Sequence, residues 1–317
     1  MCGITGKYDF RWNRTVDEEL IRRMCSQICH RGPDDEGIYV KGSIGLGMRR
    51  LSIIDLEGGH QPIFNEDKTI VLVYNGETYN FLELRELLEK RGHRFSTNTD
   101  AEALVHAYEE YGLEFIKMIR GMFAFALWDE PKKRLILARD RMGQKPLYYK
   151  EKDGTLWFCS EVKSMLVDPL VERLVDLKSL DYYLTFNYIP APRTIFKWIK
   201  KLPPATMLIC ENEKMRVEKY WTLDNSVTDT TDENECADRL YQLLSESVKM
   251  RLISDVPLGA FLSGGIDSSI IVGLMAEHSS LPVKTFSIGF TEAEFSELEY
   301  SQLIAERFST DHYEYVV

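Results

Sequence analysis

Two apolar hairpins constrain most strongly what the first two hundred residues can fold into. Each consists of two strand-like runs joined by a polar turn: MFAFALWD (122–129) and RLILARD (134–140) through EPKK, and PLYYKE (146–151) and LWFCSE (156–161) through KDG. Four more runs predict strands: GITGKYDF (3–10), DEGIYV (35–40), GSIGLGMRRLSII (42–54) and TIVLVYNG (69–76).

A few amphipathic helices separate these strands. Apolar residues at spacings of three and four predict helices near residues 17–29, 80–91 and 100–111. Strand pairs interrupted by helices are typical of two sheets that pack together with helices on their outer faces. We therefore expect an α+β domain with this layered arrangement.

The sequence changes character after about residue 203. A last strand pair around residues 207–221 leads into the polar stretch TLDNSVTDTTDENE (222–235), which has no periodicity and is typical of a linker. A long amphipathic helix is expected next. Its apolar face contains Cys236, Leu240, Leu243, Leu244, Val248 and Leu252.

Strands and helices alternate in the remaining residues. Strands are expected at VPLGAFLS (256–263), VKTFSIGF (283–290) and HYEYVV (312–317), with helices beginning near residues 267 and 296. This alternation predicts a doubly wound α/β sheet of parallel strands with crossover helices. A three-stranded parallel sheet with an unfinished edge is a poor domain, so we expect a fragment or truncated form of a longer protein.

These patterns divide the 317 residues into two domains, a number that the length also favours. We expect the first domain at residues 1–210, a linker at 211–231, and an incomplete second domain at 232–317.

The composition argues against two classes of partner. Asp and Glu number 50 against 39 Lys and Arg, a net charge of −11, and the basic residues are dispersed, so nucleic acid is not an expected partner. The sequence has neither an unbroken run of about 18 apolar residues nor a secretory signal. We therefore expect a cytoplasmic protein that does not bind a membrane.

The six cysteines include no CxxC pair, and we expect them to be reduced. Cys25, Cys29 and His30 admit two interpretations. They are spaced to ligate a metal ion, because residues i and i+4 share a helix face. Since no second ligand pair follows nearby, the sequence favours apolar core thiols on an amphipathic helix.

The second residue is the first candidate for catalysis. If an aminopeptidase removes Met1, Cys2 carries both a thiol and a free α-amine. The α-amine has an ordinary pKa near ~8 and can relay the thiol proton during acyl transfer, so no separate histidine is needed. The neighbouring Gly3 leaves room for a substrate to approach.

Six further segments follow Cys2 in a distinctive order: HRGPD (30–34), MRRLSIID (48–55), YNGETYN (74–80), NTDAE (98–102), GMFAFALWD (121–129) and RDRMGQKPLYY (139–149). Together with Cys2 they resemble the glutaminase domain of class II glutamine amidotransferases, which are N-terminal-nucleophile enzymes. The resemblance covers nearly all of the first two hundred residues. It implies an αββα sandwich and release of ammonia from glutamine.

The resemblance also implies the roles of the pocket residues. Attack of Cys2 on an amide gives an oxyanion, for which the Asn75 side chain and the Gly76 N–H are suitable donors. A free amino acid requires a guanidinium for its carboxylate and carboxylates for its ammonium, which are Arg50, Glu77 and Asp100 by the family pattern. The backbone of four residues would line the site: Leu51, Ser52, Ile53 and Ile54.

Structural interpretations of the same residues stay open at this point. An Asn-Gly pair such as Asn75 and Gly76 is commonly a hairpin turn. Asp100 is placed to cap the helix that begins at AEAL. Arg31 and Asp34 in HRGPD are suited to hold a loop.

A second motif, SGGIDSS, occupies residues 263–269 between an apolar strand and an apolar helix. Glycines and serines at such a turn expose backbone N–H groups and a helix N-terminus to a bound anion. The motif lacks the lysine of GxxxxGK[ST]. It resembles the pyrophosphate loop of ATP pyrophosphatases, which implies that five residues cradle pyrophosphate: Ser263, Gly264, Gly265, Asp267 and Ser268.

The same resemblance implies further contacts with ATP and magnesium. Asp267 would lie near the Mg²⁺ that neutralises pyrophosphate. Leu262 and Ile288, at the ends of adjacent strands, match the family's adenine and ribose contacts.

A glutaminase joined to this loop resembles the glutamine-hydrolysing asparagine synthetases. The resemblance implies that ATP converts the β-carboxylate of aspartate into an acyl adenylate. Ammonia from glutamine, passed internally, would displace AMP to give asparagine, with pyrophosphate as the other product. It also implies a homodimer that binds glutamine, aspartate and ATP with Mg²⁺.

Family members continue beyond the length of this chain with a second acidic motif resembling SGEGSDE, so synthetase activity in this chain alone is not expected. Three alternatives to asparagine synthesis stay open: amidation of another carboxylate, simple hydrolysis of glutamine, and a regulatory module without catalysis.

Mass spectrometry of the purified protein tests the first step of this interpretation. We expect the mass of a chain that begins at Cys2, because only then does the thiol have an α-amine as its base. A retained Met1 would block that amine and contradict the expectation.

Overall fold

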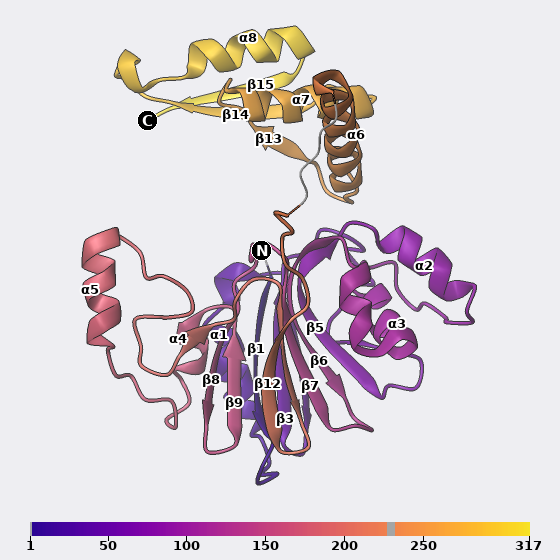
Figure 1. Cartoon of the computed structure of the whole chain (residues 1–317), viewed down its shortest axis with the longest axis vertical. Coiled ribbons are helices and arrows are strands. Elements are labelled where there is room, and N and C mark those ends of the chain that lie inside the picture. The colour runs from indigo at the N-terminus through magenta and orange to yellow at the C-terminus, as the bar shows by residue number, and fades with distance from the viewer. Residues whose placement is uncertain (1, 227–231) are drawn as a thin grey trace. The chain divides into compact units, whose positions relative to one another are not determined.

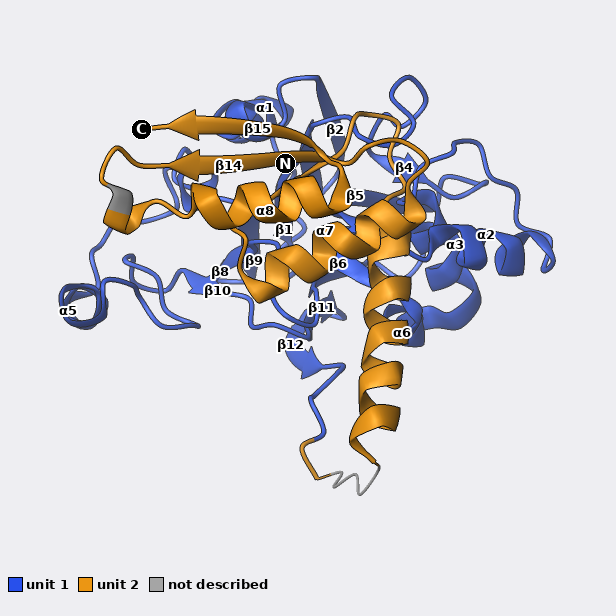
Figure 2. Cartoon of the chain, turned by 90° about the horizontal axis from the view of Figure 1, so that it is seen from above, with its two compact units in different colours: residues 1–224 blue, residues 225–317 orange. Residues whose placement is uncertain are grey.

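The computed structural model describes residues 2–226 and 232–317. The chain divides into two compact units, Met1–Asp224 and Asn225–Val317 (Figure 2). Met1 and residues 227–231, which belong to the expected linker, lie outside the described residues.

Two six-stranded antiparallel sheets form the centre of the first unit (Figure 1). The first sheet has the order β10-β8-β9-β1-β3-β2, and the second has the order β12-β11-β7-β6-β5-β4. The strands of the first sheet are β1 (Gly3–Asp9), β2 (Asp35–Lys41), β3 (Ile44–Arg50), β8 (Tyr148–Lys152), β9 (Thr155–Cys159) and β10 (Lys200–Lys201). Those of the second are β4 (Ile63–Phe64), β5 (Ile70–Thr78), β6 (Gly121–Asp129), β7 (Arg134–Arg139), β11 (Thr206–Glu211) and β12 (Lys214–Lys219).

Helices cover the outer faces of these sheets, which confirms the expected αββα order of layers. The first sheet is covered by α1 (Glu18–Ser26) and α4 (Val162–Met165), and the second by α2 (Phe81–Glu89) and α3 (Glu102–Tyr111) (Figure 1). The 3₁₀ turns are η1 (Cys29–Arg31) and η2 (Gly112–Met118). A further helix, α5 (Leu177–Phe186), was not predicted from the sequence.

The apolar runs of the central strands follow from burial on both faces. In β6, Phe125 packs toward the helices, whereas its neighbours Ala124 and Ala126 face the core between the two sheets. Successive side chains of a strand point to opposite faces, so a strand in the middle of four layers is apolar at every position. This explains why MFAFALWD and RLILARD lack polar alternation.

The first unit extends beyond residue 210. β12 pairs with β11 from Thr206 opposite Lys219 to Glu211 opposite Lys214, as the last predicted strand pair requires. Residues 214–219 therefore belong to the second sheet and not to a linker that begins at residue 211.

The second unit contains the expected alternation of strands and helices. Its parallel sheet has the order β13-β14-β15, formed by β13 (Gly259–Phe261), β14 (Lys284–Gly289) and β15 (Asp311–Val316). The helices are α6 (Glu233–Arg251), α7 (Ile266–His278) and α8 (Leu298–Phe308), with a 3₁₀ turn η3 (Ala293–Phe295).

The apolar face expected on α6 is buried only near its C-terminal end. Val248 packs against Leu274 and Met275, whereas Leu240 and Leu243 are more than half exposed. The periodicity predicted the helix correctly, and its unit covers only part of the apolar face.

Every helix in residues 2–226 and 232–317 is too short or too polar to span a bilayer.

Candidate active site

Cys2 lies directly before β1, and its position is set by the neighbouring β3. The Leu51 N–H donates to the Cys2 Sγ at 3.4 Å, and the thiol donates to the Leu51 carbonyl at 3.6 Å. Arg31 Nε donates to the Cys2 carbonyl at 2.9 Å. Burial raises the pKa of the Cys2 thiol, so at neutral pH the sulfur needs a base to become a nucleophile.

Asn75 and Gly76 lie within β5 and not in a hairpin turn, opposite Ala124 and Phe123 of β6. A Cβ on Gly76 would lie 2.4 Å from the Met122 carbonyl oxygen, so this close approach requires glycine. Asn75 is 1% exposed, and its Nδ2 has no hydrogen-bond partner among the described residues. A buried amide donor without a partner is suited to an oxyanion that forms during a reaction.

The face of β5 that carries Asn75 and Glu77 points toward the first sheet. Residues two apart on a strand share a face, and Val71 and Val73 on this same face belong to the core between the sheets. Cys2 packs against that core from the first sheet. The site therefore lies at one end of the inter-sheet core, where the apolar packing gives way to polar side chains.

Two carboxyl groups and one guanidinium line the pocket. Asp100 accepts a hydrogen bond from the Thr78 N–H at 2.6 Å, and Ala101 is the N-cap of α3, so the capping interpretation of Asp100 is wrong. Burial raises the pKa of Asp100, and burial together with the charge of Asp100 raises the pKa of Glu77. Such a pair would be stabilised in its ionised form by a cationic group between them.

Arg50 ends β3 and organises the loop that follows. Its Nη2 donates to the carbonyls of Ile54 at 2.9 Å and Asp55 at 2.7 Å. Asp34 accepts from the Ser52 N–H at 2.9 Å, so HRGPD does hold a loop, as one interpretation expected. The loop that follows Arg50 forms one wall of the pocket.

The structure brings most of the predicted glutamine-site residues to one pocket. The predicted residues that line this pocket are Cys2, Arg50, Leu51, Ile53, Ile54, Gly76, Glu77 and Asp100. Ser52 and Asn75 are not among its lining residues, although each adjoins one that is. Sequence reasoning missed five lining residues: Gly59, Gln61, Tyr74, Thr99 and Ala101.

Lys145 is a further charged group that sequence reasoning did not assign. It is 7% exposed, and burial lowers its pKa, whereas the neighbouring Glu77 carboxyl and Cys2 thiol raise it. A buried ammonium near a thiol favours the thiolate. One signal in the sequence could have identified it. Lys145 precedes the apolar run PLYY within RDRMGQKPLYY (139–149), one of the segments that carry the family resemblance.

Cys25, Cys29 and His30, which the sequence offered as possible metal ligands, have three different environments. Cys25 is a fully buried core thiol, as expected. Cys29 is exposed and accepts from Arg49 Nη2, so its assignment to the core was wrong. His30 pairs with Glu161 at 2.8 Å.

The SGGIDSS loop of the second unit connects β13 to α7. Gly264 has a φ of +80°, and a Cβ there would lie 2.4 Å from the Tyr300 carbonyl carbon, so the turn requires glycine. Ser263 and Ser268 hydroxyls lie 3.1 Å apart, and Asp267 is exposed in the first turn of α7. Within the described chain, no side chain caps α7, which leaves its N-terminus open to an anion.

The two aliphatic residues expected to contact the nucleotide differ in exposure. Leu262 is 2% exposed and packs with Val272 and Ala305, which is the structural role of a strand-end aliphatic. Ile288 is 56% exposed on β14, the strand next to β13. Only the Ile288 side chain is therefore accessible to a ligand.

The layered fold of the first unit, with a pocket at the start of its first strand, is that of the N-terminal-nucleophile glutamine amidotransferases. A solved structure of glutamine phosphoribosylpyrophosphate amidotransferase from Bacillus subtilis shares the fold with a TM-score of 0.51 at 17% identity, covering 99% of this chain and 65% of that one. The structure of an allosteric regulatory enzyme of purine biosynthesis gives a TM-score of 0.53 at 16% identity, covering 99% and 80%.

The chain belongs to the glutamine amidotransferase domain family, which it matches over residues 1–221. Residues 239–317 match the asparagine synthase family.

Curated relatives match nearly the whole chain. Asparagine synthetase [glutamine-hydrolyzing] 1 of Bacillus subtilis is 39% identical, with 100% of this chain and 50% of that protein covered. Asparagine synthetase B of Escherichia coli is 33% identical, with 99% and 54% covered. The chain thus spans about half the length of these relatives.

The location of Lys145 predicts an effect on the reactivity of Cys2. Lys145→Met removes a buried positive charge near the thiol, so the pKa of Cys2 should rise. We expect alkylation of Cys2 by iodoacetamide, followed by mass spectrometry of the Cys2 peptide, to move to higher pH.

Lys150→Met is the matched control, because Lys150 is also buried but its charged neighbours are Glu172 and Lys152. An unchanged pH profile for Lys145→Met, or an equal shift in both variants, would contradict the assignment.

Proposed function

We propose that the first unit hydrolyses glutamine to glutamate and ammonia, with Cys2 as the nucleophile. The observation that carries this proposal is the convergence of Cys2, Arg50, Glu77 and Asp100 on one pocket. The buried and unpartnered amide of Asn75 next to that pocket adds support, because ordinary packing does not account for it.

In the proposed reaction the α-amine of Cys2 takes the thiol proton, and the sulfur attacks the side-chain carbonyl carbon of glutamine. Asn75 Nδ2 and the Gly76 N–H stabilise the resulting oxyanion. Collapse of the tetrahedral intermediate returns the proton to the leaving nitrogen, releases ammonia and leaves a thioester on Cys2. Water then hydrolyses the thioester to glutamate and restores the thiol.

The proposed recognition of glutamine uses complementary charges. The Arg50 guanidinium binds the α-carboxylate, and Glu77 and Asp100 bind the α-ammonium. The raised pKa values of both carboxyl groups support this role, since the ammonium would supply the missing positive charge. Backbone groups of residues 51–54 complete the wall.

We propose that the second unit binds ATP as part of a longer asparagine synthetase. The open N-terminus of α7, the glycine turn and the serine hydroxyls support a pyrophosphate site at Ser263, Gly264, Gly265 and Ser268. Asp267 would hold Mg²⁺, since an exposed carboxylate beside phosphate oxygens is a typical magnesium ligand. The ion would neutralise phosphate charge during adenylation of aspartate.

On this proposal the β-carboxylate of aspartate attacks the α-phosphate of ATP and releases pyrophosphate. Ammonia produced at Cys2 then attacks the resulting β-aspartyl adenylate and releases asparagine and AMP. The match of residues 239–317 to the asparagine synthase family favours this over amidation of another carboxylate. We also propose a cytoplasmic location, supported by the reduced thiols of Cys2, Cys25, Cys29, Cys159 and Cys210. The resemblance further implies a homodimer, which we propose as the assembly. Residues 1–224 and 225–317 are proposed as the two functional domains.

Replacement of the nucleophile tests the glutaminase. Cys2→Ala should abolish release of glutamate from glutamine, because no other group can form the thioester. Asn75→Ala should lower kcat by about a hundredfold to a thousandfold, the usual cost of losing one oxyanion donor. Both are measured as glutamate formed by the purified chain.

Cys29→Ala is the control, since Cys29 is exposed and lies outside the pocket. Glutamate release by Cys2→Ala at the rate of the unsubstituted chain would remove the thiol from the mechanism.

The ATP site is tested by Asp267→Asn in the full-length protein. We expect the affinity for ATP with Mg²⁺, measured by calorimetry, to fall by at least about tenfold, the cost of one charged contact. Asp311→Asn is the control, because Asp311 begins β15 at the opposite end of the parallel strands. Equal affinity in both variants would overturn the assignment.

A further inference from the structure

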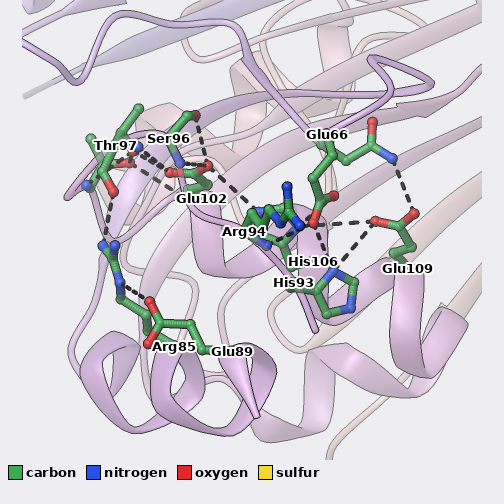
Figure 3. Close-up of polar contacts among 12 residues, drawn as sticks. Glu66, Arg85, Glu89, His93, Arg94, Ser96, Thr97, Glu102, His106 and Glu109 are labelled. Carbon is green, nitrogen blue, oxygen red and sulfur yellow. Dashed lines mark hydrogen bonds and ion pairs between the residues drawn. The ribbon is translucent and has the colours of Figure 1, made fainter. Parts of the chain in front are cut away.

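A cluster of two histidines and two glutamates lies in the helical layer outside the second sheet (Figure 3). Glu66 follows β4, His93 follows α2, and His106 and Glu109 are on α3. No sequence pattern indicated this cluster, because its members come from three separate segments. None of them lines the Cys2 pocket.

The ligand atoms of this cluster all lie within 4.8 Å of one another. His93 Nδ1 and His106 Nδ1 each lie 3.3 Å from a Glu66 carboxylate oxygen. The same two nitrogens lie 3.9 and 4.0 Å from Glu109 Oε2. Ligands at about 2.0–2.2 Å from a tetrahedral metal ion are about 3.3–3.6 Å apart, so movements of about 1 Å or less would complete such a site.

His106 gives an independent indication of a ligand. It is 0% exposed, and neither ring nitrogen has a hydrogen-bond partner in the part of the chain that the structure describes. The carboxylates of Glu66 and Glu102 lie 3.3 and 3.6 Å from its ring nitrogens without forming well-aligned hydrogen bonds, so they offset the lost hydration only in part. A metal ion at Nδ1 would satisfy it.

Neighbouring groups orient the ligands as in known metal centres. Glu102 Oε1 lies 3.6 Å from His106 Nε2, and this carboxylate is fixed by hydrogen bonds from Ser96 and Thr97. Asn65 donates to Glu109 Oε1 at 3.3 Å, which leaves Oε2 facing the histidines. A carboxylate behind a ligating histidine is a common feature of zinc sites.

We propose that Glu66, His93, His106 and Glu109 bind one zinc ion. Two imidazoles with two carboxylates suit zinc, whereas calcium and magnesium prefer oxygen ligands alone. The Glu66 and Glu109 side chains are about one-third exposed, at 36% and 37%, so the ion can enter from solvent.

The role of this zinc ion is structural. It joins the β4–β5 turn, the α2–α3 connection and the middle of α3, and α3 begins two residues after Asp100 of the Cys2 pocket. The ion thereby holds the helix whose start forms one side of that pocket. The zinc site does not depend on the proposed glutaminase or synthetase reactions.

The test is titration of zinc into chelator-treated protein, with calorimetry and thermal unfolding as readouts. We expect one zinc ion per chain and a higher unfolding temperature on binding. His93→Gln and, separately, Glu66→Gln should each weaken binding by at least about tenfold, the loss that even groups behind the ligands cause. These two side chains are more exposed than His106, so folding of at least one variant is expected and is verified by circular dichroism.

His60→Gln is the matched control, because His60 is an exposed histidine that pairs with Asp35. Zinc affinity in His60→Gln should equal that of the unsubstituted chain. Substitution by cobalt(II) should give a tetrahedral spectrum without a thiolate charge-transfer band. Absence of zinc binding, equal affinity in all variants, or a thiolate band from cysteine ligands would each overturn the proposal and leave the cluster as an ionic network.

Discussion

The register of β1 against β3 is the constraint on which the Cys2 pocket depends. Gly3 pairs with Arg49, so the register places Cys2 opposite Arg50, and its Sγ contacts the backbone of the next residue, Leu51. Side chains alternate along a strand, and a shift of one residue would turn the next side chains to the opposite face. The position of the thiol is thus decided first by a ladder of backbone hydrogen bonds, and the contacts of Cys2 with Leu51 and Arg31 then hold it there.

A second strand supplies the groups opposite the thiol. β5 pairs with β6 over its whole length, which places Asn75 and Glu77 on the face toward the first sheet and lets Gly76 approach the β6 backbone closely. Asn75 Nδ2 lacks a hydrogen-bond partner among the described residues, and burial together with the charge of Asp100 raises the pKa of Glu77. Unsatisfied polarity at the end of an apolar core is costly, and it is expected where a polar substrate completes the interactions.

Local sequence patterns predicted the elements well where one face or both faces are buried. The hairpins β6–β7 and β8–β9, the helices α1 to α3, and the alternation of the second unit are as expected. The errors concern long-range packing. α6 has an apolar stripe that its own unit buries only toward its C-terminal end, and the linker does not begin at residue 211, because residues 214–219 form the predicted last strand of the second sheet. The spacing of apolar residues reveals which residues share a face of a helix or strand, but it does not reveal what covers that face.

The sequence by itself determined the strands and helices, the order of the motifs behind Cys2, and the glycine turn at Gly264, because these depend on residues close together in the chain. Only the tertiary structure decided that Asn75 Nδ2 has no hydrogen-bond partner among the described residues, that Lys145 lies near Cys2, and that His93 and His106 lie 3.3 Å from Glu66. The physical reason is that burial and charge proximity depend on strand pairing and helix packing between distant segments, which a local pattern does not encode.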